Sequence, residues 1–376
     1  MLSAETFHPS ELTEPDATAW RALQASERDF ANPLLGPDFA RAVGRARDDA
    51  RVSMFHREGR TVGFLAYHLR PGGFVRAIGA PFSDYHALVA EPGLSPAEAL
   101  AAAGLAAFRF TGLVDPHGVF GPDIASQAEA FLIALDGSAE VYLEALRAAS
   151  PKRFKNYRRL DHKLDREVGT LRIVAPDQDP AAFEQLLAWK RDQLTRTGVH
   201  DVLASDWSRS LMGELFETRQ GPMCGLMINL YAGDRLAAGH FGVRSGDYFH
   251  PWIASTDPEL AAWSPGQVFL SRAIAAMPEL GLATYDLGAS HAHYKRPYAL
   301  SARMIGEGLT TSATAQGRVA QLSRQAWILA GGVGSGPVAR LRRRLDSIAA
   351  AEPSLAGRAR GLASAIAARA SILELA

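Results

Sequence analysis

The sequence predicts an α/β protein with two tandem domains, each holding a mixed but largely antiparallel sheet, followed by a C-terminal helical tail. Three observations lead to this prediction. The chain contains a weak internal repeat, both halves follow the order helix, helix, three strands, helix, and the sequence beyond Thr314 becomes rich in Ala and Arg. We expect one domain in residues 1–149, a second in 150–314 and the tail in 315–376.

The internal repeat relates a segment that begins at Phe55 to one that begins at Asn229. Four pairs of similar residues each lie 174 positions apart: Gly59 and Gly233, Arg70 and Arg244, Gly72 and Gly246, and Phe74 and Tyr248. In both segments, two Gly-containing turns separate short runs of β-forming residues. This pattern predicts a three-stranded antiparallel meander in each half.

Helical segments are expected on both sides of each meander. In the first half we expect helices at 20–29 and 37–46 before the strands, and at 95–110 after them. In the second half we expect helices at 181–197 and 205–217 before the strands, and at 265–280 after them. A strand at 130–135 and a helix at 139–148 close the first half.

A basic amphipathic helix is expected at 150–167, as a strut between the halves, because its apolar residues recur at helical spacing: Phe154, Tyr157, Leu160 and Leu164. In the tail, Pro337 opens a helix that ends before Pro353, and residues 355–373 form another. We expect these to form a hairpin on the second domain. The Arg340–Arg344 cluster fits a solvated helix face or, alternatively, a patch for peripheral membrane contact.

Composition excludes several classes of protein. A single cysteine, Cys224, rules out an intrachain disulfide framework and fits a small core residue better than a nucleophile. The formal net charge of zero argues against a general nucleic-acid binder. The acidic N-terminus lacks the basic start of a signal peptide, and the apolar stretch 326–333 is too short to span a bilayer, so we expect a cytoplasmic protein.

The densest cluster of reactive side chains runs from Tyr285 to Arg296, with the sequence YDLGASHAHYKR. A strand at 283–287 is expected to end at Gly288, and ligands commonly bind beyond the carboxyl end of such a strand. Asp286 fits either a catalytic carboxylate or an acceptor for backbone amides in this turn. Lys295 fits either a contact with an anionic ligand or an ion pair with Asp286.

Metal binding is the alternative for the two imidazoles of this cluster, His291 and His293. Two histidines without a third ligand make a poor metal site, so no metal is expected.

A second cluster, WSPGQ at 263–267, opens an apolar helix. A helix start without bulky side chains leaves backbone N–H groups and a positive dipole end that suit a pyrophosphate. Pro251 lies within the strand-like segment 247–255, and proline cannot donate to a strand ladder. We therefore expect two strands to part near Pro251 and to leave room for an extended, peptide-like ligand such as a pantetheine arm.

Six segments in a fixed order carry a family resemblance. They are SPKRFKNYRRLDHKLDRE from Ser150, INLYAGDRLAAGHFGVRSGDYFHPWIAS, WSPGQVFLSRAI, YDLGASHAHYKRPYA, and, in the first half, ANPLLGPDFARAV from Ala31 and APFSDYHALV from Ala80. Together they resemble the CelD/BioF2-like branch of the GNAT acetyltransferases, which is related in fold to the Fem peptidoglycan aminoacyltransferases. The resemblance covers about Asp29 to Thr310.

The resemblance implies tandem GNAT-like domains, acetyl-CoA or another acyl-CoA as donor, and an amino sugar or other amine as acceptor. It also implies a role in exopolysaccharide or cell-envelope biosynthesis, with a small-molecule or lipid-linked saccharide as substrate. The GNAT pyrophosphate loop would correspond to 262–267, where only Gly266 keeps the family pattern.

Roles follow from the needs of amide-forming acyl transfer, which are alignment, a base and oxyanion stabilisation. Asp286 or His250 is the expected base, and Tyr294 or Lys295 the expected group that binds the acceptor or protonates the thiolate. The expected donor-binding residues are Trp252, Ile253, Ser264, Gly266 and Gln267. The expected acceptor-binding residues are Tyr157, His291, His293 and Arg296.

Two alternatives remain open. One is a Fem-like transferase that uses aminoacyl-tRNA, although the basic helix is short and no nucleic-acid partner is expected from the net charge. The other is a non-catalytic GNAT-like scaffold that binds a polysaccharide-synthesis partner. Binding of acetyl-CoA distinguishes the acyltransferase from the scaffold.

Overall fold

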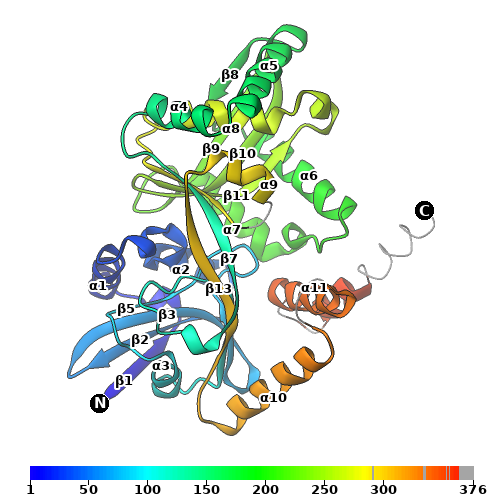
Figure 1. The fold of residues 1–376 in the computed structure, drawn as a ribbon. Coiled ribbons are helices and arrows are strands. Elements are labelled where there is room, and N and C mark those ends of the chain that lie inside the picture. Colours follow the sequence, from blue (N-terminus) through cyan, green and yellow to red (C-terminus); the bar gives the residue numbers. More distant parts are fainter. Residues whose placement is uncertain (290–291, 333–335, 353, 355, 364–376) are drawn as a thin grey trace. The chain divides into compact units, whose positions relative to one another are not determined.

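The computed structural model describes residues 1–376 except 290–291, 333–335, 353, 355 and 364–376 (Figure 1). Contacts divide the chain into two compact units. Unit 1 comprises Met1–Gln127, Leu194–Leu211 and Ile305–Ala376, and unit 2 comprises Ala128–Gln193 and Met212–Met304. These units are discontinuous in sequence, whereas the expected domains are continuous; the boundaries after residues 149 and 314 stay a prediction.

Unit 1 contains strands of the first copy of the repeat. They are β1 (Leu2–Phe7), β2 (Ala50–Arg57), β3 (Arg60–Arg70), β4 (Phe74–Ala77), β5 (Leu88–Ala90) and β6 (Ala107–Leu113). Its helices include α1 (Glu14–Ala25), α2 (Pro37–Ala46), α3 (Pro96–Ala102), α10 (Ala315–Leu329) and α11 (Pro337–Ala351). The strands follow the order β1-β2-β3-β4-β6-β13, with β5 beside β3, and only β4 and β6 pair in parallel among the register pairs of this unit.

Unit 2 repeats this arrangement. Its strands are β8 (Leu171–Val174), β9 (Cys224–Ala232), β10 (Arg235–Ser245), β11 (Tyr248–Thr256) and β12 (Thr284–Gly288). Its helices are α4 (Ala139–Ala149), α5 (Pro151–Glu167), most of α6 (Pro180–Arg196), part of α7 (Asp206–Glu217), α8 (Pro265–Ala276) and α9 (Ala292–Lys295). The strand order is β8-β9-β10-β11-β12-β7, and β11 and β12 are parallel while the other described pairs are antiparallel.

The predicted meanders are present in both units. Gly59 and Gly233 have positive φ angles of 77° and 60°, and they turn the chain between the first two strands of each meander. Gly72 and Gly246 have φ angles of 78° and 55° and precede the third strand. Glycine suits these positions because side chains with a Cβ rarely adopt positive φ. The α/β fold class with two similar halves and a helical tail is therefore confirmed.

The two halves exchange their last strands. Strand β7 (Ile124–Ala134) follows β6 in sequence but pairs with β12 in unit 2. Strand β13 (Ser301–Thr311) follows β12 but pairs with β6 in unit 1. Each unit therefore completes its sheet with a strand from the other copy of the repeat, which explains why the units are discontinuous.

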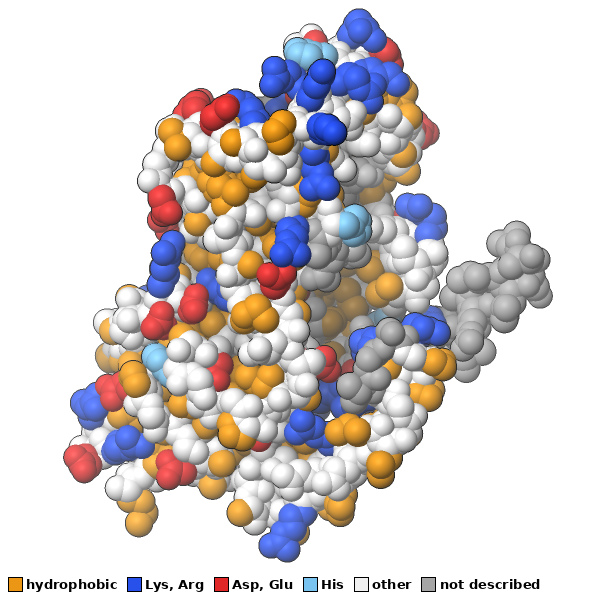
Figure 2. Space-filling model, viewed as in Figure 1, with side chains coloured by type: hydrophobic (Ala, Val, Ile, Leu, Met, Phe, Trp, Pro, Cys, Tyr) orange, Lys and Arg blue, Asp and Glu red, His pale blue; other side chains and the backbone are white. Residues whose placement is uncertain are grey.

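Helices α5 and α8 bury apolar faces in the core of unit 2. The spacing that predicts α5 is confirmed, since Phe154, Tyr157, Leu160 and Leu164 are all buried. Val268, Phe269 and Ile274 of α8 are 1% exposed or less. Burial of each such side chain contributes about 1.5–3 kcal/mol to stability. This core therefore holds α8 in place against the sheet of unit 2. The opposite, basic face of α5 is exposed, and Figure 2 shows blue side chains gathered where α5 lies in Figure 1.

The expected helix at 95–110 is only partly correct. Helix α3 ends at Ala102, and residues 107–113 form strand β6. Gly104 has a φ of 67° and ends the helical run, while Phe108 and Phe110 alternate with outward-facing residues and pack into the core. The helix expected at 20–29 begins earlier, because Thr13 caps α1 at Glu14.

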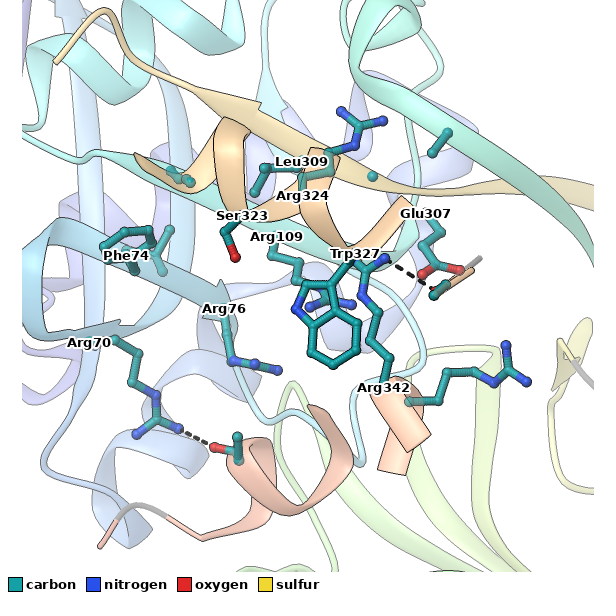
Figure 3. A pocket seen from close by; sticks show the side chains of 18 of the residues that line it. Arg70, Phe74, Arg76, Arg109, Glu307, Leu309, Ser323, Arg324, Trp327 and Arg342 are labelled. Atoms are coloured by element: carbon teal, nitrogen blue, oxygen red, sulfur yellow. Dashed lines mark hydrogen bonds between the residues drawn. The ribbon is translucent and has the colours of Figure 1, made fainter. Parts of the chain in front are cut away.

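The tail prediction is wrong in one respect. Its helices pack in unit 1, with the first half of the repeat, rather than on the second domain. Helices α10 and α11 border a pocket of about 710 Å³ that β3, β4 and β6 line from the sheet side (Figure 3). The end of the segment expected to be helical at 355–373 lies outside the described residues.

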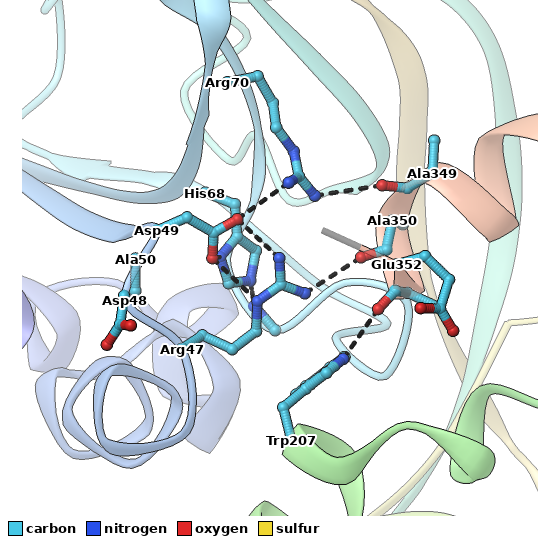
Figure 4. A network of polar contacts seen from close by, with 12 residues as sticks. Arg47, Asp48, Asp49, Ala50, His68, Arg70, Trp207, Ala349, Ala350 and Glu352 are labelled. Atoms are coloured by element: carbon cyan, nitrogen blue, oxygen red, sulfur yellow. Dashed lines mark hydrogen bonds and ion pairs between the residues drawn. The ribbon is translucent and has the colours of Figure 1, made fainter. Parts of the chain in front are cut away.

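Side chains of unit 1 bind the last carbonyl groups of α11 (Figure 4). The donors are Arg70 to Ala349 at 3.1 Å, Arg47 to Ala350 at 3.1 Å and Trp207 to Ala351 at 2.9 Å. The last carbonyls of a helix have no partner within the helix and form its negative dipole end, so arginine and indole donors stabilise it there. The sequence of the tail does not predict these three donors, because they are distant from α11 in the chain.

Within the described residues, no helix combines the length and the apolar character that a membrane crossing requires.

Candidate active site

Strands β11 and β12 part soon after they begin. Their parallel pairing consists of Tyr248 with Thr284 and Phe249 with Tyr285. Among the described residues, β12 pairs with no residue of β11 beyond Phe249. The divergence expected near Pro251 is therefore confirmed, since the proline comes two residues after the last pair.

The other edge of β11 is irregular at the same place. Phe241 of β10 pairs with Ile253 and Gly242 pairs with Pro251, so Trp252 is an extra residue in β11. Such a bulge bends a strand and changes the direction of its backbone groups. Gly242 is required there, because a Cβ at this position would lie 2.1 Å from the carbonyl oxygen of His250. Trp252 and Ile253 thus lie at the bend where the strands separate.

Helix α8 begins without a side-chain cap. Ser264 occupies the N-cap position with a φ of 49° and makes no side-chain capping hydrogen bond, and Pro265 has no N–H. The amides of Gln267 and Val268 both bond to the carbonyl of Ser264, at 3.0 and 3.5 Å. This leaves the Gly266 amide at the positive end of the helix dipole without a hydrogen-bond partner among the described residues.

Gly266 also lies close to two side chains. A Cβ at this position would lie 3.1 Å from Thr256 and 3.3 Å from the hydroxyl of Tyr294. Tyr294 donates a hydrogen bond to the Gly266 carbonyl at 3.1 Å, and Tyr298 donates one to the Gln267 carbonyl at 2.7 Å. These hydroxyls contact carbonyl groups, so they do not occupy the helix amides. The Gln267 side-chain oxygen is buried without a hydrogen-bond partner among the described residues.

His250 and Asp286 are the first residues of β11 and β12 beyond the last strand pair. Both are fully buried, and the Nδ1 atom of His250 lies 3.7 Å from Oδ1 of Asp286. The preceding residues, Phe249 and Tyr285, pack in the same core as α8. Because successive side chains of a strand point to opposite faces of the sheet, His250 and Asp286 face away from α8. The structure thus brings together the two side chains that the sequence offered as alternative bases.

Asp286 is held as a carboxylate. Burial alone would raise its pKa, but interactions with His250 and Arg303 together hold this pKa well below its usual range. The Tyr248 hydroxyl donates a short hydrogen bond to one carboxylate oxygen, and the Gly288 amide donates to the other at 2.9 Å. The turn contact considered from the sequence is therefore present, and it coexists with the contact to His250.

The short helix α9 follows β12. Burial raises the pKa of Tyr294 above its usual value, so its hydroxyl stays protonated at neutral pH. The Lys295 ammonium donates to the carbonyl of Ala289 at 2.6 Å, so it contacts the loop after β12. His291 lies outside the described residues.

Two of the expected acceptor-binding residues share a pocket in unit 2. His293 and Arg296 line a cavity of about 460 Å³ together with Arg153 of α5. Arg296 is 70% exposed and lies 3.8 Å from Glu129. Tyr157 is placed differently, because it is buried in the core and stacks on Tyr298 with ring centroids 5.4 Å apart.

One buried pair was missed by the sequence reasoning. The Nδ1 atom of His240 lies 2.5 Å from the Tyr285 hydroxyl, on the α8 side of the sheet. Burial, aided by the charges of Lys295 and Lys190, lowers the pKa of His240 to about 3. His240 is therefore neutral at pH 7 and a weak base. The alternation of β10 could have placed it inward, but no local signal pairs it with Tyr285, 45 residues later.

Among the described residues, no group of three or more His, Cys, Asp or Glu side chains is arranged to hold a metal ion.

Part of the chain matches a known family. Residues 151–296 match the family model described as an acetyltransferase (GNAT) domain, which is less than half of the chain and includes β11, α8, β12 and α9. No curated protein sequence is significantly similar to the chain.

Several solved structures are similar in fold. The structure of FemX is 12% identical with a TM-score of 0.55, over 85% of this chain and 99% of that chain. A tandem GNAT protein from the clavulanic acid biosynthesis pathway is 12% identical with a TM-score of 0.46, over 84% and 100%. The C-terminal domain of a putative lysylphosphatidylglycerol synthetase from Agrobacterium fabrum is 13% identical with a TM-score of 0.45, over 76% and 91%.

Residues 151–296 thus match the model of a GNAT acetyltransferase domain, and the fold of the chain is similar to that of FemX. The identity to FemX is 12%, so this similarity concerns the fold alone.

Proposed function

We propose that the chain is an acyl-CoA-dependent N-acyltransferase, with acetyl-CoA as the first donor to test and a primary amine as acceptor. The observation that carries this proposal is the separation of β11 and β12 beyond Phe249, next to the uncapped start of α8 in unit 2. A pyrophosphate suits the Gly266 amide and the helix dipole, and the pantetheine amides suit the edge of a strand whose neighbour has moved away.

His250 is the proposed general base. It is the first β11 residue beyond the segment that pairs with β12, and its Nδ1 atom lies 3.7 Å from Oδ1 of Asp286. A base removes the proton that the attacking amine must lose, and an adjacent carboxylate orients the imidazole and stabilises its protonated form. Asp286 is then a positioning residue, because its low pKa makes it a poor proton acceptor.

Tyr294 is the proposed acid for the departing thiolate. Its hydroxyl lies 3.1 Å from the Gly266 carbonyl at the start of α8, and its raised pKa means that it is protonated at neutral pH, although a weaker acid than a free tyrosine. A backbone N–H between Pro251 and Ile253 is the proposed oxyanion donor, since the bulge at Trp252 bends β11 there.

The acceptor proposed is an amino sugar of exopolysaccharide or cell-envelope biosynthesis, in small or lipid-linked form. The pocket lined by Arg153, His293 and Arg296 supports an acceptor that carries an anionic group as well as an amine. A phosphate-linked amino sugar has both groups. Lys295 would help to position the loop that borders this acceptor.

The test begins with calorimetric titration of acetyl-CoA, followed by turnover with glucosamine and glucosamine phosphate. We expect submillimolar binding in the wild type and in Tyr294→Phe, and turnover at least about tenfold lower in Tyr294→Phe because an acid is lost. Tyr298→Phe is the matched control, since its hydroxyl also donates to a carbonyl of the first turn of α8. Equal turnover in both variants would remove Tyr294 from the mechanism, and absence of acetyl-CoA binding would refute the donor assignment.

A second candidate is a Fem-like transferase that takes its acyl group from aminoacyl-tRNA. The observation that favours it is the exposed basic face of α5, with Lys152, Arg153, Lys155, Arg158, Arg159 and Arg166 (Figure 2). Such a face attracts phosphates. Transfer of a radiolabelled amino acid from its tRNA, lost when Lys155 and Arg159 are both replaced by Gln, would favour this candidate over the first.

A further inference from the structure

An arginine-lined pocket lies in unit 1, apart from the residues assigned to acyl transfer. Its volume is about 710 Å³, and among the residues that the structure describes it is lined by seven arginines and one acidic residue, Glu307. Arginines come from the sheet (Arg70, Arg76, Arg109) and from the tail helices (Arg324, Arg342, Arg343). Figure 3 shows the side chains of Arg76, Arg109 and Arg342 extending toward the ring of Trp327.

Two aspartates pair with arginines of the pocket. Asp346 of α11 lies 3.1 Å from Arg76 and 2.5 Å from Arg109, and Asp49 lies 3.0 Å from Arg70. Arg342 makes a weaker contact with Asp346, at 4.0 Å. The Nε atoms of Arg70 and Arg342 are buried with no hydrogen-bond partner among the described residues. Buried cationic donors without partners are costly, and a bound anion would relieve that cost.

Burial and the neighbouring positive charges lower the pKa values of two pocket arginines. Burial lowers the pKa of Arg70 to about 10, and the neighbouring Arg47, Arg358 and Arg76 act in the same direction. Burial also lowers the pKa of Arg76, with Arg109 adding to the effect. A planar guanidinium group matches the geometry of a phosphate, which makes this set of arginines better suited to phosphate than to a simple halide.

The rest of the pocket is partly apolar, with Ser126, Ser323 and Glu307 as its other polar side chains among the described residues. Phe74, Leu309, Val319, Trp327 and Ile328 line it beside the arginines. A ligand that fills the pocket therefore carries a phosphate and an apolar portion. A cavity of this size lies in the range of small-molecule sites, about 300–1,000 Å³.

Helix α10 also exposes apolar side chains, beside the exposed polar residues Gln316, Gln321 and Gln325, and it has no acidic residue. Leu322 and Leu329 are 64% and 88% exposed, and they lie on one side of the helix because two turns separate them. Ile328 and Val319, which line the pocket, are 46% and 59% exposed. Exposed leucines, a tryptophan and arginines on one short helix are typical of helices that lie in a membrane interface.

We infer that this pocket binds the phosphate headgroup of an anionic lipid, with α10 lying against the lipid surface. The arginines of the pocket would contact the phosphate, Trp327 and Phe74 would contact the adjoining apolar part of the lipid, and Leu322 and Leu329 would enter the acyl region. This site is independent of the proposed donor site, because every residue used here belongs to unit 1.

The test is co-sedimentation of the full chain with vesicles of phosphatidylcholine that contain either phosphatidic acid or oleic acid. Both additives make the vesicle negative, but only phosphatidic acid supplies a phosphate monoester. We expect binding to the phosphatidic acid vesicles, weakened about fivefold or more in Arg342→Gln, since one basic residue at a membrane is worth about 1 kcal/mol. Arg340→Gln is the matched control, because this exposed residue of α11 does not line the pocket.

The contribution of α10 is tested separately with Leu329→Ser. We expect vesicle binding to weaken about tenfold as one leucine is lost from the lipid phase. Val141→Ser is the control, because Val141 is 69% exposed but belongs to α4 in unit 2. An unchanged melting temperature without lipid shows that the substitutions leave the fold intact, and Leu329→Ser remains informative should Arg342→Gln not fold.

Three results would overturn the inference. They are equal binding of both vesicle types, equal effects of Arg342→Gln and Arg340→Gln, and binding of inorganic pyrophosphate to the pocket without any vesicle binding. The last result would show a soluble phosphate ester in place of a lipid. Acetyl-CoA binding is measured in parallel, and its retention in Arg342→Gln separates this site from the donor site.

Discussion

The two units share one topology but differ at the position where their parallel strands meet. In unit 1, β4 and β6 pair through Phe74, Val75 and Arg76, and Arg76 lies opposite Arg109. In unit 2, the pairing of β11 with β12 stops one residue earlier, so His250 and Asp286 occupy the first positions at which these two strands are not paired with each other. His250 is 174 residues after Arg76, the offset of the repeat. The same backbone position thus carries a His–Asp pair in one unit and an arginine pair in the other.

The helices that follow these strands differ as well. In unit 1, Ser95 caps α3 by accepting a hydrogen bond from the Glu98 amide. In unit 2, Ser264 makes no such bond and α8 begins uncapped. A capped helix end has fewer amides to offer an anion. The comparison teaches that a duplicated fold can keep its strand order while one copy carries the proposed donor site and the other a basic pocket beside the tail.

The largest expected effect separates the two equivalent positions. His250→Ala is expected to reduce turnover by about 10²–10⁴-fold, because a general base is removed. Arg76→Gln is expected to leave turnover within about twofold, because Arg76 contacts Asp346 of the tail and not the donor site. Steady-state kinetics with acetyl-CoA and an amine checks both. A similar loss of turnover in the two variants would contradict the assignment of the catalytic base to unit 2 alone.

The next largest effect concerns stability at acid pH. Burial lowers the pKa of His68 and of His86 in unit 1 to about 4, and that of His240 in unit 2 to about 3. The unfolded chain, with histidine pKa values near 6.5, then binds more protons than the folded chain. Stability is therefore full above about pH 6.5 and is lost as pH falls toward 4, by up to about 3 kcal/mol for each of the two unit 1 histidines.

Urea unfolding between pH 7.5 and 4.5 measures this loss. His86→Gln keeps an acceptor for the amides of Thr111 and Gly112 but cannot titrate, so it is expected to flatten the pH dependence. His162→Gln, at an exposed position of α5, is the control and is expected to leave the dependence unchanged. A stability that rises on acidification would contradict the assignment of neutral, buried histidines.

The smallest expected effect tests the two helix starts. Ser95→Ala is expected to reduce stability by about 1 kcal/mol through loss of the cap of α3. Ser264→Gly is expected to raise it by about 0.4–1 kcal/mol, because Ser264 has a φ of 49° and glycine adopts that conformation without strain. Thermal unfolding of both variants provides the measurement. A destabilised Ser264→Gly would mean that the Ser264 side chain supports the helix start after all.

Much of the fold could be predicted because it depends on local patterns. The glycine turns of the meanders, the apolar spacing of α5 and the proline at the start of α2 and α8 all specify their elements from neighbouring residues. The site could be predicted in part. Pro251 and the glycine at the start of α8 pointed to the separating strands, whereas the contact between His250 and Asp286 depends on a parallel pairing across 36 residues.

By itself, the sequence determined most of the helices and the strands of the meanders, that the meander occurs twice, and that reactive side chains follow the strand that ends at Gly288. Only the tertiary structure decided that β7 and β13 are exchanged between the units, that the tail packs with unit 1, and that His240 lies against Tyr285. The physical reason is range. Periodicity and turn chemistry act over a few residues, but strand exchange, helix docking and buried polar pairs are set by which distant surfaces bury each other with their polar groups satisfied.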